Sequence, residues 1–239
     1  EAEKPADPDA DKGKSVDLES IDIAGVALKD ANIRYRDAQT GQAYRIEKLN
    51  LDTGALQPGK SIDIEASLSA IAEAQKMSGD LTLSATVLAD MVAQKASISD
   101  LSLAVTTQGD GMNASAKLEG NVAANLGTQL VDVSDLKLDF DTQMADLSAK
   151  GTLTGKLKAA LAEQQFEVAG LKLDADASGD AIPGGAQELA LSGNALYNGS
   201  QGTLKFNDGK IRAAGLNVST SITGQGLNGD NPRLSGPID

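Results

Sequence analysis

Three related hexapeptides decide the fold: ISDLSL at residues 98–103, VSDLKL at residues 133–138 and VAGLKL at residues 168–173. Each copy begins 35 residues after the copy before it. Their Leu-x-Leu ends alternate apolar with polar residues, which is the pattern of a β-strand with one apolar face and one wet face. A looser copy, AGLNV at residues 214–218, follows after a longer interval. We interpret these stretches as equivalent strands of one internal repeat.

The same alternation continues outside the hexapeptides, for example in LNL at residues 49–51 and LTL at residues 81–83. Leu118-Glu-Gly120 and Leu153-Thr-Gly155 keep the 35-residue step, so each unit holds two strands and two turns. Turns are indicated by QGDG at residues 108–111 and other Gly-rich stretches. The sequence therefore predicts an all-β fold, an elongated antiparallel β meander built from two-strand repeats, with little or no helix. One helix-like stretch, LKAALAEQQ at residues 157–165, has a less helical counterpart one repeat earlier, which favours strand there too.

The chain divides into a short N-terminal stretch and one long uniform part. Residues 1–14, EAEKPADPDADKGK, contain two prolines and many charges, which predicts a flexible acidic linker. Residues 15–239 keep the same alternating composition without a second linker, so we expect a single repeat-built β domain. We expect this chain to be a segment of a larger exported protein.

Composition excludes several classes of function. The chain has no Cys and no His, so thiolate chemistry, disulfides and Ser-His-Asp or Cys-His catalysis are excluded. The net charge of −13 comes without a basic stripe, which argues against a nucleic-acid partner. We expect a protein that is not an enzyme and that needs no metal and no other cofactor.

Two motifs deserve a functional and a structural reading. The pairs Asp139/Asp141 and Asp174/Asp176 could bind calcium or act as an acid and a base, as in a carbohydrate hydrolase. Their place in the polar phase of the alternation favours a solvated face instead. GQGLNG at residues 224–229 matches the dinucleotide fingerprint, but Pro232 follows it closely, so a helix cannot begin there and a turn is favoured.

The remaining candidate is the apolar stripe that the repeated strands would form side by side. Its predicted residues are Leu101, Leu103, Val105, Leu136, Leu138, Phe140, Leu171, Leu173, Leu216 and Val218. Either the stripe is the core of a closed β-sandwich, or it lines a half-pipe that stays open to acyl chains. The residues themselves favour the closed core, while the lack of a set of covering helices keeps the half-pipe open as the second reading.

Three stretches of this sequence resemble the AsmA family of Gram-negative envelope proteins. They are residues 23–37, which continue through Thr40-Gly41 to residues 46–51; residues 98–103; and residues 216–239, ending LSGPID. The resemblance covers nearly all of residues 16–239, and the hairpin from Tyr35 to Gly41 is its most distinctive part.

This resemblance implies a fold, a location and a function. The implied fold is a β-taco groove, whose lining would be the residues of the apolar stripe. The implied location is the periplasm, with a tether to the inner membrane outside this chain. The implied function is transport of phospholipid between inner and outer membranes, with the acyl chains in the groove. Strand-edge pairing with other envelope proteins is a further implied contact. The alternative is a closed β-sandwich spacer or an outer-membrane protein assembly factor.

Overall fold

The computed structural model describes residues 24–37, 39–55, 57, 59–180, 182, 184–229 and 231–237, and the linker predicted for residues 1–14 lies outside them. The described residues form one antiparallel sheet, which confirms the all-β prediction. Its strands are β1 (Val26–Arg36), β2 (Ala43–Thr53), β3 (Ile62–Ala72), β4 (Met77–Asp90), β5 (Lys95–Gly109), β6 (Met112–Asn125), β7 (Leu130–Gln143), β8 (Ser148–Ala160), β9 (Gln165–Ser178), β10 (Ala186–Asn198), β11 (Thr203–Ala213), β12 (Leu216–Gln225) and β13 (Arg233–Ser235).

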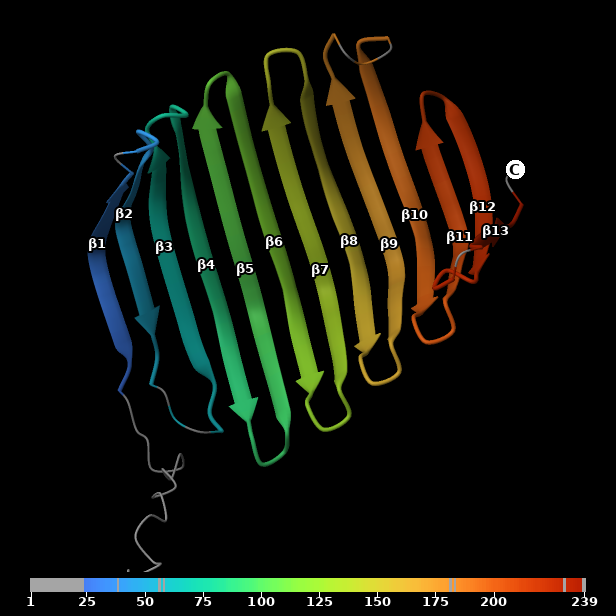
Figure 1. Cartoon of the computed structure of the whole chain (residues 1–239), viewed down its shortest axis with the longest axis horizontal. Coiled ribbons are helices and arrows are strands. Elements are labelled where there is room, and N and C mark those ends of the chain that lie inside the picture. The colour runs from blue at the N-terminus through green and yellow to red at the C-terminus, as the bar shows by residue number, and fades with distance from the viewer. Residues whose placement is uncertain are drawn as a thin grey trace, which may run out of the picture.

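The topology is a plain meander, in which each strand pairs only with its neighbours in sequence, from β1 to β13 (Figure 1). The sheet is curled but does not close on itself, because β1 and β13 are not paired with each other. Within the described ranges no α-helix is formed, and none of these residues belongs to a helix that could cross a membrane.

The two-strand repeat is visible as the pairs β5–β6, β7–β8 and β9–β10. The three hexapeptides occupy the same place in β5, β7 and β9, as their 35-residue spacing predicts. The position assigned to the fourth copy is wrong. Leu216 begins β12, which pairs antiparallel with β11, whereas the three hexapeptides lie in the odd-numbered strands β5, β7 and β9. The true counterpart is residues 206–211 of β11, where Asp208 has the same positive φ as Asp100 and Asp135. Both neighbouring strands alternate apolar with polar residues, so the pattern alone matched either of them.

Turns fall where the sequence indicates them. Asp110 and Gly111 both have positive φ, 44° and 77°, which makes the tight two-residue hairpin between β5 and β6. Asp37 accepts a hydrogen bond from the Gln39 amide on its Oδ1 atom at 2.8 Å, an Asx turn that opens the β1–β2 hairpin. The helix-like stretch is strand up to Ala160 and then a four-residue turn, as the repeat argument favoured over local propensity.

A line of β-bulges crosses the sheet and bends its strands. In β5 the residues from Ile98 to Leu101 face only Val122 to Gly120 of β6, so β5 holds one extra residue. The extra residue has positive φ at Asp100, Asp135, Gly170 and Asp208, in β5, β7, β9 and β11. Because a bulge bends and twists its strand, a row of bulges at one level bends the whole sheet along one line.

Candidate functional site: the open apolar face

The strand register gathers the predicted site residues on one face of the sheet. Directly paired side chains form a continuous row across twelve strands, in the order Leu28, Leu51, Ala66, Leu83, Leu103, Leu118, Leu138, Leu153, Leu173, Leu191, Ile211 and Val218. Paired residues of neighbouring strands point to the same side of a sheet. We call the side that carries this row the apolar face, and the other side the polar face.

All ten predicted residues lie on the apolar face. Leu103, Leu138, Leu173 and Val218 belong to the leucine row itself. On one side of that row lie Leu101, Leu136 and Leu171, paired with Gly120, Gly155 and Gly193. On its other side a ladder starting at Val105 passes through Phe140 and ends at Leu216. The structure thus brings the ten residues together on one surface.

Beyond the bulges a second apolar row runs parallel to the first. Its members are Ile62, Val87, Ile98, Val122, Val133, Leu157, Val168, Ala195, Phe206 and Ile222. The sequence prediction missed this row because the bulges break the alternation between it and the leucine row. No position that the register places on the apolar face of β1–β13 carries a charged residue.

All six aromatic residues of the chain also lie on the apolar face. Tyr35 stacks on Tyr44, and Phe166 stacks on Tyr197, each with ring centroids 6.3 Å apart. Phe140 lies over Gly151, where an added Cβ would meet the ring at 2.7 Å. Phe206 covers Gly193 and Gly209 in the same way. Phe140 and Phe206 therefore fill the space that these glycines leave on the floor of the face.

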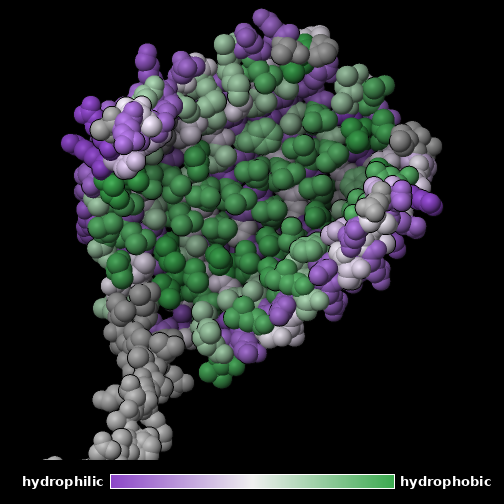
Figure 2. All heavy atoms as spheres, in the orientation of Figure 1, coloured by the Kyte–Doolittle hydropathy of each residue, from purple (hydrophilic) through white to green (hydrophobic). Residues whose placement is uncertain are grey.

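The apolar face is open to its surroundings. Figure 2 shows it as a hollowed hydrophobic surface with hydrophilic residues gathered along its edges. Within the described residues no second sheet and no helix covers it, and Ala159, 6% exposed, is the only apolar side chain in the buried class. The arrangement matches the half-pipe of the two alternatives and lacks the second layer that a closed sandwich needs.

A hydrogen-bonded ladder holds the bulges in place. The Asn121 side chain accepts from the backbone amide of Asp100 at 3.0 Å and donates to the Asp135 carboxylate at 3.2 Å. Asn194 accepts from the Gly170 amide at 2.8 Å and donates to Asp208 at 3.2 Å, so it repeats the arrangement two units on. These contacts tie the bulge at Asp100 to that at Asp135, and the bulge at Gly170 to that at Asp208.

The charged side chains gather on the polar face, where they pair with one another. Lys137 donates to Asp139 and Lys172 donates to Asp174, both at 2.6 Å and one repeat apart. The hydrogen bond from Lys137, with a second one from Thr152, holds the pKa of Asp139 below its ordinary value. Exposed pairs of this kind stabilise a fold only slightly, and they are typical of a solvated surface.

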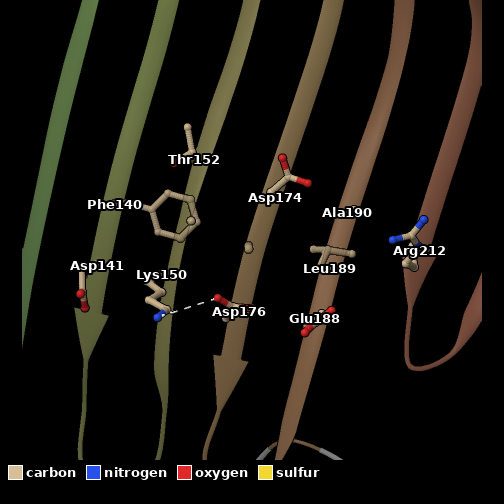
Figure 3. Close-up of a pocket in the computed structure, with 12 residues that line it drawn as sticks. Phe140, Asp141, Lys150, Thr152, Asp174, Asp176, Glu188, Leu189, Ala190 and Arg212 are labelled. Atoms are coloured by element: carbon tan, nitrogen blue, oxygen red, sulfur yellow. Dashed lines mark ion pairs between the residues drawn. The ribbon is translucent and has the colours of Figure 1, made fainter.

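The two acidic pairs do not come together as a metal centre in the described residues. Figure 3 shows Asp141, Asp174 and Asp176 around one shallow pocket, with Lys150 paired to Asp176 at 4.0 Å. Across the described part of the chain no three acidic residues lie close enough to hold a metal ion. The GQGLNG motif forms the end of β12 and a turn, without a helix after it in the described residues.

The chain matches no protein-family model, no curated protein and no solved structure. The resemblance to the AsmA family therefore stays a prediction. What the geometry offers on its own is a long, uncharged and uncovered apolar face.

Proposed function

We propose that this chain is a periplasmic segment of an AsmA-type protein that carries phospholipid along its apolar face between the inner and outer membranes. One observation carries the proposal: among the described residues, the apolar face crosses the strands without a charged residue and without a covering layer. The location and the two membranes rest on the sequence resemblance alone. The acyl chain as ligand rests on the face itself.

The dimensions of the face suit an acyl chain that lies across the strands. Twelve strands at about 4.8 Å spacing give the leucine row a length of roughly 50 Å. The hydrocarbon core of a bilayer is about 30 Å thick, so the acyl chains of one leaflet extend over about 15 Å. More than one lipid can therefore lie along the row in single file.

The chemistry of the face suits movement along it as well as binding. Hydrophobic attraction is non-directional and depends on the area that is buried. Because the leucine row presents Leu or a similar side chain at nearly every strand, an acyl chain gains about the same contact at each step. A headgroup that stays in water at the open side would need no site of its own.

The decisive experiment compares two neighbouring residues on opposite faces. Leu138→Gln places an amide in the middle of the leucine row, while Lys137→Gln makes the same new side chain on the polar face. Losing most of the burial of one leucine, about 1.5 kcal/mol or more, predicts a roughly tenfold weaker affinity for a fluorescent acyl chain in the Leu138→Gln variant. The Lys137→Gln variant should bind like the wild type.

Both variants must first be shown to be folded by their far-ultraviolet circular dichroism. Equal affinities of two folded variants would reject the groove as the binding site. A wild-type chain that binds no acyl chain, and that carries no phospholipid after purification, would reject the transport proposal and favour a spacer or an assembly role.

A further inference from the structure

The turns at one end of the strands carry exposed apolar side chains at the repeat spacing. They connect β4 to β5, β6 to β7 and β8 to β9, along the lower edge of the sheet in Figure 1. Their first residues, Met91, Leu126 and Leu161, are 35 residues apart and are 73%, 50% and 49% exposed. Val92 beside Met91 is 88% exposed. We call these three turns the apolar rim.

Such residues are unusual at turn tips, where Gly, Asn, Asp and Ser dominate. Nothing in the architecture of the sheet requires them, because the tips make no core. The turn between β10 and β11, Gly199-Ser-Gln-Gly202, occupies the equivalent place at the same end without a large apolar residue. Among the four-residue turns at this end, only the three between β4 and β9 therefore carry large apolar residues.

The opposite ends of the strands are more acidic, although Met144 in the β7–β8 connection is 48% exposed there. Each of five successive connections there carries an acidic residue, and these residues are Asp37, Glu73, Asp110, Asp146 and Asp180. The apolar rim carries one acidic residue, Glu163, in its three turns. A surface that disfavours charge would therefore bind the apolar rim more readily than the acidic connections at the opposite ends of the strands.

Part of the backbone of the apolar rim is already hydrogen-bonded, which lowers the cost of taking it out of water. The amide of Leu126 donates to the Gln94 carbonyl at 2.8 Å, and that of Leu161 donates to the Gln129 carbonyl at 3.0 Å. Inside the turns, the Ala93 amide donates to Asp90 at 2.8 Å and the Thr128 amide donates to Asn125 at 3.0 Å. Backbone groups that are satisfied within the protein are what contact with lipid demands.

We propose that the apolar rim seats in the surface of an uncharged lipid bilayer, and that acyl chains pass over it between the bilayer and the apolar face. The tips are separate points about 10 Å apart, at two strand spacings each, and do not form a contiguous patch. A protein interface needs roughly 800 Å² from each partner, whereas separate apolar side chains can enter a bilayer interface singly.

The charge of the chain selects the kind of bilayer. With a net charge of −13, the chain is repelled by anionic lipids, so zwitterionic headgroups are the matching surface. The passage of acyl chains over this rim rests on the proposed lipid-carrying function, while the seating of the rim in a bilayer does not. Acyl chains that enter over the apolar rim would load the groove along its length as well as at its ends.

The natural absence of Trp makes the test direct, because one introduced Trp is the only such fluorophore in the chain. Val92→Trp places it on the apolar rim, and Gln75→Trp places it in the β3–β4 turn at the acidic end as a matched control. When phosphatidylcholine vesicles are added, we expect the Trp fluorescence emission to shift to the blue, and to be quenched by brominated acyl chains, for the Val92→Trp variant only. Equal responses of the two variants, or no response of either, would overturn the proposal.

A charge variant separates the rim from the groove. The combined changes Val92→Asp, Leu126→Asp and Leu161→Asp should lower the partitioning onto phosphatidylcholine vesicles by roughly tenfold or more. Binding of a soluble fluorescent acyl chain without vesicles should stay at the wild-type level. Unchanged partitioning of this variant, or wild-type partitioning that requires anionic lipid, would contradict the rim proposal. A wild-type chain that binds no soluble acyl chain would contradict only the groove function.

Discussion

Glycines on the apolar face have two different structural roles, which the surroundings of β8 separate. At Gly151 an added Cβ would come within 2.6 Å of the Asp174 carbonyl and 2.7 Å of the Phe140 ring. At Gly155, on the same face of the same strand, the nearest atom would be 3.6 Å away, which is ordinary contact. The first glycine is required by a close approach, and the second is not.

This difference predicts opposite effects of the same substitution on stability. Gly151→Ala should lower the free energy of unfolding by about 1–3 kcal/mol, because the ring and the neighbouring strand must shift. Gly155→Ala should leave it unchanged or raise it by up to about 1 kcal/mol, because alanine loses less backbone entropy than glycine on folding. Urea unfolding of the two variants measures both, and a Gly151→Ala variant as stable as Gly155→Ala would disprove the close approach.

At the scale of single strands, the extra residue in β5 predicts where a deletion is tolerated. β5 holds one residue more than both β4 and β6 between Ser99 and Ser102, and Asp100 occupies the bulge. Removing Asp100 leaves two regular ladders, with Leu101 and Ile98 still on the apolar face. Removing Ser102 instead also removes the extra residue, but it places Asp100 on the apolar face and Leu101 on the polar face, because side chains alternate along the strand.

We therefore expect the Asp100 deletion to give a folded sheet with a weaker bend, and the Ser102 deletion to lose more stability because it places a carboxylate on the apolar face. Circular dichroism and urea unfolding compare their stability, and small-angle scattering reports the change of curvature. Equal damage from the two deletions would show that the bulge is not the place where the register is adjusted.

The strands show how far the sequence predicted the fold. Alternation and the 35-residue step predicted the meander, its two-strand units and the shared face of the ten residues, because those depend on local periodicity. The bulges were missed, although Ile98 and Leu101 stand three apart and so break the alternation within the hexapeptide itself. The second apolar row follows from cross-strand register, which no single strand encodes.

At the scale of the molecule, every contact between strands in the described residues joins neighbours in sequence. Nothing joins β1 to the far half of the sheet, so stability is a sum over strands and the interfaces between adjacent strands. A strand in the middle is held on two sides, whereas β1 is paired only with β2, and the short β13 only with β12. Opening should therefore cost least at the two edges.

This one-dimensional architecture predicts graded protection from amide hydrogen exchange. Protection should be highest in β5 to β9 and should fall towards β1 and β13, since edge strands can open without the rest. Ending the chain after Asn198, which removes β11 to β13, should expose β10 while the protection of β5 to β7 stays at its wild-type level. Uniform protection in the whole chain, or its general loss in the shortened chain, would instead reveal a single cooperative core. Only the graded result is consistent with a sheet whose apolar face has no second layer to bind its strands together.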